Sequence, residues 1–287
     1  MIHFKYMLNN IKFYIQKSVA QNKWLSPFYP IYMIRRYSID RLVKHQIISF
    51  PKSGRTWVRY FLMQYFASAY GTSEKLSFRT LLKRHSAIPR YQCDHFDFTS
   101  SIPELEQQLK SLAGQHVLFL VRDPRDVIVS LYKHSQNRQD LANTQGLSLS
   151  DFVRHENLGV VHIVSYMNTC LKSSELCKTF TVVSYEELRN HAPKKSFLSI
   201  LNFLEQLPVN QQAFDKAMKK SSFSAMKEAE ISGSHTDPAL SAVDKKNPDS
   251  YKVRTGKVGG YLTELSPEDI KYCNKAMLRL DKSFKYS

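Results

Sequence analysis

One nine-residue segment, Ser-Phe-Pro-Lys-Ser-Gly-Arg-Thr-Trp, limits the fold of this chain more than any other. It runs from Ser49 to Trp57, after the apolar pair Ile47 and Ile48 and before a stretch whose apolar residues recur at helical spacing. A strand, a tight loop and a helix in this order form an anion cradle, because backbone N–H groups converge there and the helix dipole favours negative charge. Lys52 adds a positive charge. The segment therefore predicts a phosphate or sulfate site, and the alternative is an ordinary turn with a solvated lysine.

The loop differs from the loop that binds nucleoside triphosphates. That pattern requires Gly, four residues, Gly, Lys and then Ser or Thr, whose hydroxyl group binds Mg²⁺. Here Lys52 precedes Gly54, and the leading glycine is absent. The order Pro-Lys-Ser-Gly-x-Thr-Trp instead resembles the 5′-phosphosulfate loop of sulfotransferases that use 3′-phosphoadenosine 5′-phosphosulfate (PAPS).

Strand and helix patterns alternate from residue 46 onward. Short apolar runs predict strands at residues 46–50, 116–121 and 180–183. Residues 229–258 are rich in Ser, Lys, Gly, Asp and Pro and predict a long loop. Helices are predicted at residues 57–69, 103–112, 125–132, 197–204, 211–220 and 266–281. We therefore expect an α/β fold of three layers, with a central parallel sheet flanked by helices and ligands bound at the carboxyl ends of the strands.

Residues 1–45 differ from the remainder, residues 46–287, which we expect to form the catalytic domain. They contain eight Lys or Arg residues and a single acidic one, Asp40, with apolar residues at helical spacing. This pattern predicts a basic amphipathic N-terminal arm. The apolar stripe of the arm either docks on the domain or lies on an anionic membrane surface.

The charge and the cysteines narrow the partners and the compartment. The formal net charge is +16, from 41 Lys and Arg against 25 Asp and Glu, which predicts anionic partners without choosing among nucleotides, acidic glycans, nucleic acid and membranes. The four cysteines show no metal-binding spacing and fit free thiols in a reducing compartment. No apolar run is long enough for a transmembrane helix, and lysines interrupt any signal peptide. We expect a cytoplasmic protein, with membrane contact through the arm as the alternative to docking.

Two further motifs carry groups that bind anions. Arg122 stands at the end of the second predicted strand and Ser130 about two helical turns later, so that a guanidinium fork and a hydroxyl can hold one phosphate. The alternative is a charge cluster in which Asp126 pairs with Arg122 or Arg125. Residues 254–260, Arg-Thr-Gly-Lys-Val-Gly-Gly, form a basic glycine-rich loop whose N–H groups can approach an anion, or else a flexible surface loop.

The three motifs, in this order, resemble the PAPS-dependent sulfotransferase family over nearly all of residues 46–280. The resemblance implies that Lys52 contacts the bridging oxygen of the phosphosulfate and neutralises the departing phosphate. It implies that the loop is completed by Ser53, Gly54, Arg55, Thr56 and Trp57, with Trp57 also on the adenine. The 3′-phosphate would be held by Arg122, Ser130, Arg254, Thr255 and Gly256. The stretches Ser-Tyr-Glu-Glu and Ser-Ser-Phe-Ser-Ala-Met-Lys place Tyr185, Ser221 and Phe223 at the adenine.

The reaction requires a base that accepts a proton from the acceptor hydroxyl, and histidine is suited to this near neutral pH. The family's catalytic histidine precedes the second strand. His95, 27 residues before Arg122, is the candidate, and His85 is the rival.

Three positions depart from the family pattern. Arg55 stands where cytosolic members often carry threonine, and Thr255 replaces a second basic residue. Gly-Tyr-Leu at residues 260–262 replaces Asp-Trp-Lys. These departures suggest a branch other than the animal enzymes for phenols and steroids.

The resemblance thus implies an enzyme that transfers a sulfuryl group from PAPS to an acceptor hydroxyl, leaving PAP (3′-phosphoadenosine 5′-phosphate), and we expect no metal requirement and no nucleic-acid partner. The basic composition and the basic arm favour a hydroxyl of a carbohydrate or glycolipid as the acceptor. A small lipophilic alcohol or phenol, favoured by the aromatic content, is the alternative acceptor. More distant alternatives are a nucleotide kinase and a non-catalytic basic protein that binds membranes or nucleic acid.

Overall fold

The computed structural model describes residues 44–72, 86–138, 141, 144–234, 240, 247 and 250–286. The chain divides into two units, Met1–Lys44 and His45–Ser287, and the architecture below is that of the second unit. The predicted arm up to residue 43 and the rival base His85 lie outside the described residues.

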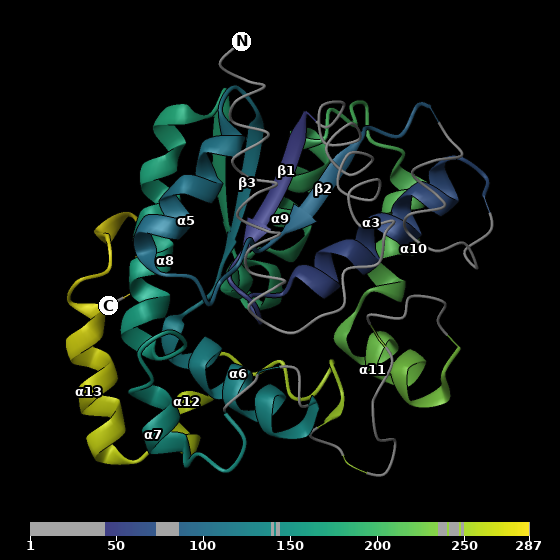
Figure 1. Cartoon of the computed structure of the whole chain (residues 1–287). Helices are drawn as coiled ribbons and strands as arrows, with labels where there is room; N and C mark the ends of the chain where they lie inside the picture. The colour runs from purple at the N-terminus through teal and green to yellow at the C-terminus, as the bar shows by residue number, and fades with distance from the viewer. Residues whose placement is uncertain are drawn as a thin grey trace, which may run out of the picture. The chain divides into compact units, whose positions relative to one another are not determined.

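The centre of the fold is a four-stranded parallel sheet in the order β2-β1-β3-β4 (Figure 1). The strands are β1 His45–Ser49, β2 Tyr91–Asp94, β3 His116–Val121 and β4 Thr179–Ser184. Three of them confirm the predicted strands. Strand β2 was not predicted, because its sequence Tyr-Gln-Cys-Asp contains no apolar run.

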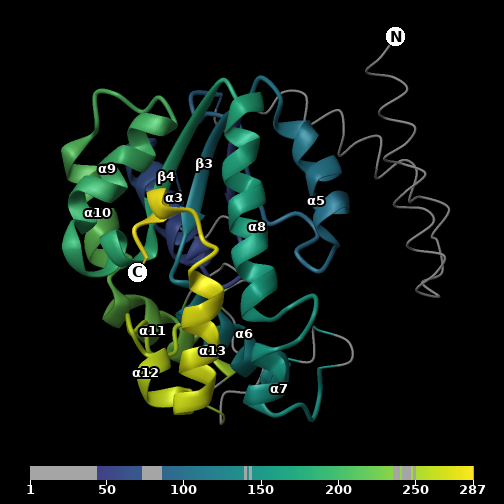
Figure 2. The same cartoon turned by 90° about the vertical axis from the view of Figure 1, so that its left-hand side faces the viewer.

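Helices cover both faces of the sheet, as the alternating pattern predicted. Ile48, Val117 and Phe119 belong to one buried core with α5, α8 and α13, whereas Ile47 and Leu118 belong to a second core with α3, α9 and α10. Figure 2 shows the sheet between α9 and α10 on one side and α5 and α8 on the other. These helices are α3 Arg55–Ala69, α5 Ile102–Leu109, α8 Val160–Lys172, α9 Pro193–Phe203, α10 Gln211–Lys220 and α13 Pro267–Met277.

The other α-helices of the described residues gather at the carboxyl ends of the strands (Figure 1). They are α6 Pro124–Arg138, α7 Leu149–Val153, α11 Phe223–Ser232 and α12 Tyr261–Glu264. Short 3₁₀ turns occupy Lys110–Leu112, Ser173–Leu176 and Lys282–Phe284, and a π-helical turn occupies Glu187–His191. Among the described residues, no helix is long and apolar enough to cross a bilayer.

Helix α11 corrects the prediction of a loop over residues 229–258, because it continues to Ser232. Its start is capped by Ser222, whose hydroxyl accepts a hydrogen bond from the N–H of Ala225. Burial of Met226 and Glu230 extends the helix into the polar stretch, and Gly233, with φ of 68°, ends it. The polar composition indicated a loop because a glutamate is usually exposed to solvent, whereas Glu230 is buried.

Candidate functional site

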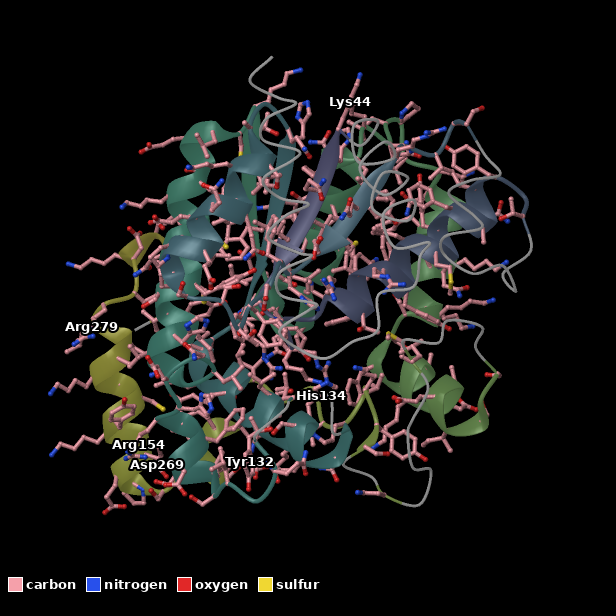
Figure 3. The ribbon with its side chains drawn as sticks, in the orientation of Figure 1. Lys44, Tyr132, His134, Arg154, Asp269 and Arg279 are labelled. Atoms are coloured by element: carbon pink, nitrogen blue, oxygen red, sulfur yellow. The ribbon has the colours of Figure 1, made fainter. Side chains whose placement is uncertain are left out.

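A pocket of about 430 Å³ opens at the carboxyl ends of the strands. Figure 3 shows the two ends of the sheet: Lys44 precedes β1 at the amino end, whereas His134 of α6 lies near the pocket. The predicted site residues that line the pocket are Lys52, Gly54, Arg55, Thr56, Trp57, His95, Arg122, Ser130, Tyr185, Phe223, Arg254, Thr255 and Gly256. Ser53 and Ser221 are buried beside it, with 2% and 1% of their surface exposed.

The loop between β1 and α3 places the first turn of α3 at the pocket. Lys52 and Gly54 both have positive φ, at 72° and 96°. A Cβ atom on Gly54 would lie 2.8 Å from Cδ2 of Tyr185, so this position requires glycine. Among the described residues no side chain caps α3, and its first turn contains no acid. The free N–H groups and the positive end of the dipole are therefore available to an anion.

Arg122 joins two loops of the pocket with one guanidinium group. It donates hydrogen bonds to the backbone carbonyls of Lys52, at 3.3 Å, and of Lys257, at 3.0 Å. Its guanidinium carbon lies 4.3 Å from the centre of the Tyr185 ring. The remaining nitrogen, Nε, is buried without a hydrogen-bond partner among the described residues. Such an unsatisfied donor in a pocket favours an anionic ligand.

The carboxylate of Asp126 organises the glycine-rich loop. It lies 3.6 Å from Arg122, as the charge-cluster alternative expected, while Arg125 pairs with Asp123 at 2.8 Å. The same carboxylate accepts hydrogen bonds from the N–H groups of Gly259, at 2.9 Å, and Tyr261, at 3.0 Å. Pairing with Asp126 therefore coexists with a place for Arg122 in the pocket.

Gly256 is the point at which this loop closes on the aromatic residues. Its φ is 58°, and a Cβ atom here would lie 2.5 Å from Cε2 of Phe223 and 3.2 Å from the hydroxyl of Tyr185. Arg189 donates to the carbonyl of Gly256 at 3.1 Å and lies over the Phe223 ring, 5.0 Å from its centre. Only glycine fits this contact, and Arg189 was not predicted as a site residue.

Three aromatic side chains line one side of the pocket: Trp57, Tyr185 and Phe223. The rings of Trp57 and Tyr185 meet edge to face, with centres 5.8 Å apart. The indole N–H of Trp57 donates to the carbonyl of Ser221 at 2.7 Å, and the Ser221 hydroxyl donates to Ala217. Ser221 thus supports Trp57 through its backbone, and its own side chain turns into α10.

His95 follows β2 and lines the same pocket. Burial first, and then the charge of Arg55, lowers the pKa of His95 to about 4. Its Nδ1 atom is buried without a hydrogen-bond partner among the described residues. The Asp94 carboxylate accepts from the backbone N–H groups of His95, at 2.8 Å, and Phe96, at 3.0 Å, and so holds the turn that presents the imidazole.

Arg55 begins α3 and points into the interior near His95. Burial lowers the pKa of Arg55, and its Nη1 atom is buried without a partner in the described part of the chain. Two buried, unsatisfied donors, Arg55 and Arg122, therefore belong to one pocket. This donor set suits a ligand with more than one negative group.

Other residues of the pocket were not predicted as site residues. Ser49 is the last residue of β1, and its position at the carboxyl end of a strand is the signal that could have identified it. The carboxylate of Glu230 on α11 accepts hydrogen bonds from the backbone N–H groups of Lys252, at 2.6 Å, and Val253, at 2.8 Å. No sequence pattern links these two segments. The others include Asp126, Val129, His134, Met226, Tyr251, Lys257 and Glu264.

Comparison with known proteins bears on this pocket. The family model of the sulfotransferase domain matches residues 44–284. Sulfotransferase 2B1 of Rattus norvegicus is 26% identical over 212 residues, a match that covers 67% of this chain and 58% of the relative. This chain therefore spans less than two thirds of that relative's length.

Two solved structures share the fold. Mouse sulfotransferase SULT7A1 complexed with PAP superposes with a TM-score of 0.56 at 18% identity, covering 84% of this chain and 86% of the other. Retinol dehydratase in complex with androsterone and PAP gives a TM-score of 0.54 at 15% identity, covering 81% and 79%.

Proposed function

This chain belongs to the sulfotransferase domain family, and we propose on that premise that it transfers a sulfuryl group from PAPS to an acceptor hydroxyl. The observation that carries the proposal is a single pocket in which the uncapped start of α3 and Lys52 lie beside Arg122 and the loop of residues 254–257. A pocket lined by several cationic side chains and a helix start suits a nucleotide that carries both a 5′-phosphosulfate and a 3′-phosphate.

The residues present fit PAPS. Arg55 and Arg122 each leave a buried donor without a partner among the described residues, which an anionic ligand would satisfy. We assign the phosphosulfate to residues 52–57 and the 3′-phosphate to Arg122, Ser130, Arg254, Thr255 and Gly256. The adenine would lie against Trp57, Tyr185 and Phe223, with Ser221 supporting Trp57 from behind.

When bound, PAPS supplies an activated sulfuryl group. The proposed role of His95 is to accept the proton of the acceptor hydroxyl. Its lowered pKa keeps the imidazole neutral at pH 7, which is the form that a base requires. A polyanion bound beside it would raise this pKa toward neutrality and so strengthen the base. Lys52 and the N–H groups at the start of α3 would stabilise the charge that develops on the departing phosphate.

For the acceptor we propose a carbohydrate or glycolipid hydroxyl, supported by the net charge of +16 and the basic N-terminal arm. A small lipophilic alcohol or phenol is the second candidate. It is favoured by the aromatic residues of the pocket and by retinol dehydratase, whose structures hold retinol or androsterone together with PAP.

The test is calorimetric titration of the purified full chain with PAP, with ADP as the control nucleotide. PAP should bind at least about tenfold more tightly than ADP, since hydrogen bonds to a charged group contribute about 1.5–3 kcal/mol. Arg254→Ala should remove most of this preference, whereas Lys271→Ala, which removes an exposed charge on α13, should leave it intact. Equal affinity for PAP and ADP would contradict the assignment of the 3′-phosphate site and favour a kinase or a non-catalytic protein.

A further inference from the structure

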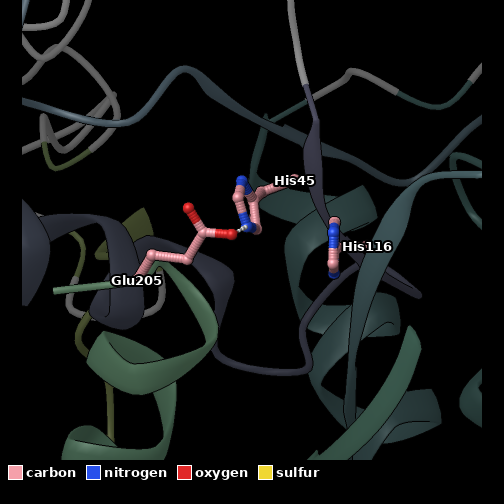
Figure 4. Close-up of side chains that lie close together, drawn as sticks. All are labelled: His45, His116 and Glu205. Atoms are coloured by element: carbon pink, nitrogen blue, oxygen red, sulfur yellow. Dashed lines mark ion pairs between the residues drawn. The ribbon is translucent and has the colours of Figure 1, made fainter. Parts of the chain in front are cut away.

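A second group of ionisable side chains lies at the amino ends of the strands, at the opposite end of the sheet from the pocket. His45 begins β1 and His116 begins β3, and the two residues are paired in register. Side chains at paired positions of neighbouring parallel strands project from the same face of the sheet. Glu205, two residues after the end of α9, approaches this face from the side (Figure 4).

These three side chains lie close together. Nε2 of His45 is 3.6 Å from Oε1 of Glu205, and the carboxylate is directed at the imidazole (Figure 4). The rings of His45 and His116 stack with centres 4.9 Å apart. One nitrogen or oxygen of each residue can be chosen so that all three atoms lie within 4.8 Å of one another.

We propose that His45, His116 and Glu205 bind a divalent transition metal ion, for which Zn²⁺ is the best match. Two imidazoles and one carboxylate are a donor set that zinc accepts, with water as the fourth ligand. Carboxylate-rich sites suit magnesium or calcium, but two nitrogen donors argue against both.

The site can contract to the size that zinc requires. Zinc bonds of 2.0–2.2 Å place the ligand atoms about 3.3 Å apart in a tetrahedron, closer than they lie here. His45 is 3% exposed and packs edge to face against Phe203, with the ring centres 5.2 Å apart. It therefore provides a fixed ligand. The side chain of Glu205 is 70% exposed and His116 is half-buried, so these two can turn toward His45.

A hydrogen bond selects the tautomer of His116. Its Nδ1 atom lies 2.9 Å from the hydroxyl oxygen of Thr179 on β4. With Nδ1 donating to that oxygen, Nε2 carries the lone pair that binds a metal, the arrangement common around zinc-binding histidines. The metal would link the end of α9 to β1 and β3, and it would stabilise the fold without entering the nucleotide pocket.

The test uses the full chain after removal of metals by a chelator. Calorimetric titration with Zn²⁺ should show one site per chain, and Zn²⁺ should raise the Tm. Co²⁺ in its place should give the intense visible absorption of tetrahedral coordination. His116→Ala and Glu205→Gln, at positions exposed enough to leave the fold intact, should each weaken Zn²⁺ binding at least about tenfold without changing PAP affinity.

His191→Ala is the matched control, because His191 is an exposed histidine of the π-helical turn. It should bind Zn²⁺ as the unmodified chain does. Absence of zinc binding would overturn the proposal. Equal affinity in His116→Ala, Glu205→Gln and the unmodified chain would also overturn it, and would assign the metal to the free cysteines or to another part of the chain.

Discussion

Burial and, after it, the neighbouring charge of Arg55 set the protonation state of His95. Both residues line the pocket, and the positive charge of Arg55 adds to burial in lowering the pKa of His95 to about 4. Threonine, which the family resemblance leads us to expect at position 55, would carry no such charge. The departure from the family pattern at Arg55 therefore has an electrostatic consequence at the proposed base.

The pH dependence of catalysis should show this coupling. A base must be deprotonated to act, so kcat/KM for PAPS, which reports the enzyme before PAPS binds, should stay constant on acidification until the pH approaches about 4 and should fall below it. Arg55→Thr should shift this fall to higher pH, because loss of the nearby cation raises the pKa of His95. His95→Ala should reduce turnover by about a hundredfold or more.

These profiles are measured by steady-state kinetics, with PAP binding followed at each pH as a control for folding. An acid limb that Arg55→Thr does not move, or full activity of His95→Ala, would show that another group is the base.

At the residue scale, the sequence predicted the groups that belong to local motifs. Lys52, Arg122 and Gly256 all line the pocket. Two residues were missed because only tertiary contacts place them. Arg189 lies over the ring of Phe223, which lines the pocket, and Lys252, which lines the pocket itself, is held by Glu230. Such contacts leave no pattern at a fixed spacing.

At the scale of elements, α11 and the loop that follows it form one unit. The Glu230 carboxylate, 1% exposed, accepts hydrogen bonds from the backbone N–H groups of Lys252 and Val253. Both residues line the pocket, immediately before Arg254. A buried charge on a helix therefore positions the loop assigned to the 3′-phosphate.

Glu230→Gln should loosen this loop. The amide keeps the size of the side chain but exchanges one acceptor oxygen for a donor, which faces a backbone N–H group. We expect a loss of about 1–3 kcal/mol in the free energy of unfolding and weaker PAP binding. Urea unfolding and calorimetry measure the two effects, and Glu228→Gln, at an exposed position of the same helix, is the control. Unchanged PAP affinity in Glu230→Gln would show that the loop is positioned by other contacts.

Element types were predictable where periodicity was strong. The buried strands β1 and β3 and the amphipathic helix α10 were expected from their apolar patterns. Strand β2 was not, because it lies at the edge of the sheet and only Tyr91 of its four residues is buried. An edge strand of this length is formed by pairing with β1, which no single segment of sequence can indicate.

For the whole molecule, residues 45–287 form a unit that contains both cores and every candidate site residue in the described part of the chain. We therefore propose that residues 1–44 are an arm and that the rest of the chain is a self-sufficient domain. A chain of residues 44–287 should fold cooperatively and bind PAP within about 0.5 kcal/mol of the full chain.

Thermal unfolding and PAP titration of the shortened chain check this prediction. Flotation with anionic vesicles, compared between the two chains, tests the membrane role of the arm. A shortened chain that fails to fold, together with a full chain that does not bind vesicles, would favour docking of the arm on the domain.

The arrangement of layers could be predicted from the alternation of strands and helices in the sequence. The cluster of His45, His116 and Glu205 could not be predicted in this way. These residues are separated by 71 and 89 positions, and only the register of β1 against β3 and the end of α9 bring them together. Topology, more than local pattern, decides which distant side chains meet.

The guanidinium of Arg122 has a consequence for the order in which the molecule is made. It holds the carbonyls of Lys52 and Lys257, and the half-buried carboxylate of Glu186 accepts hydrogen bonds from the N–H of Asp123 and the hydroxyl of Tyr286. Lys257 is synthesised 135 residues after Arg122, and Tyr286 is synthesised 100 residues after Glu186. A growing chain can therefore form the four strands of the sheet before it can complete the pocket, which must wait for the residues from 257 onward.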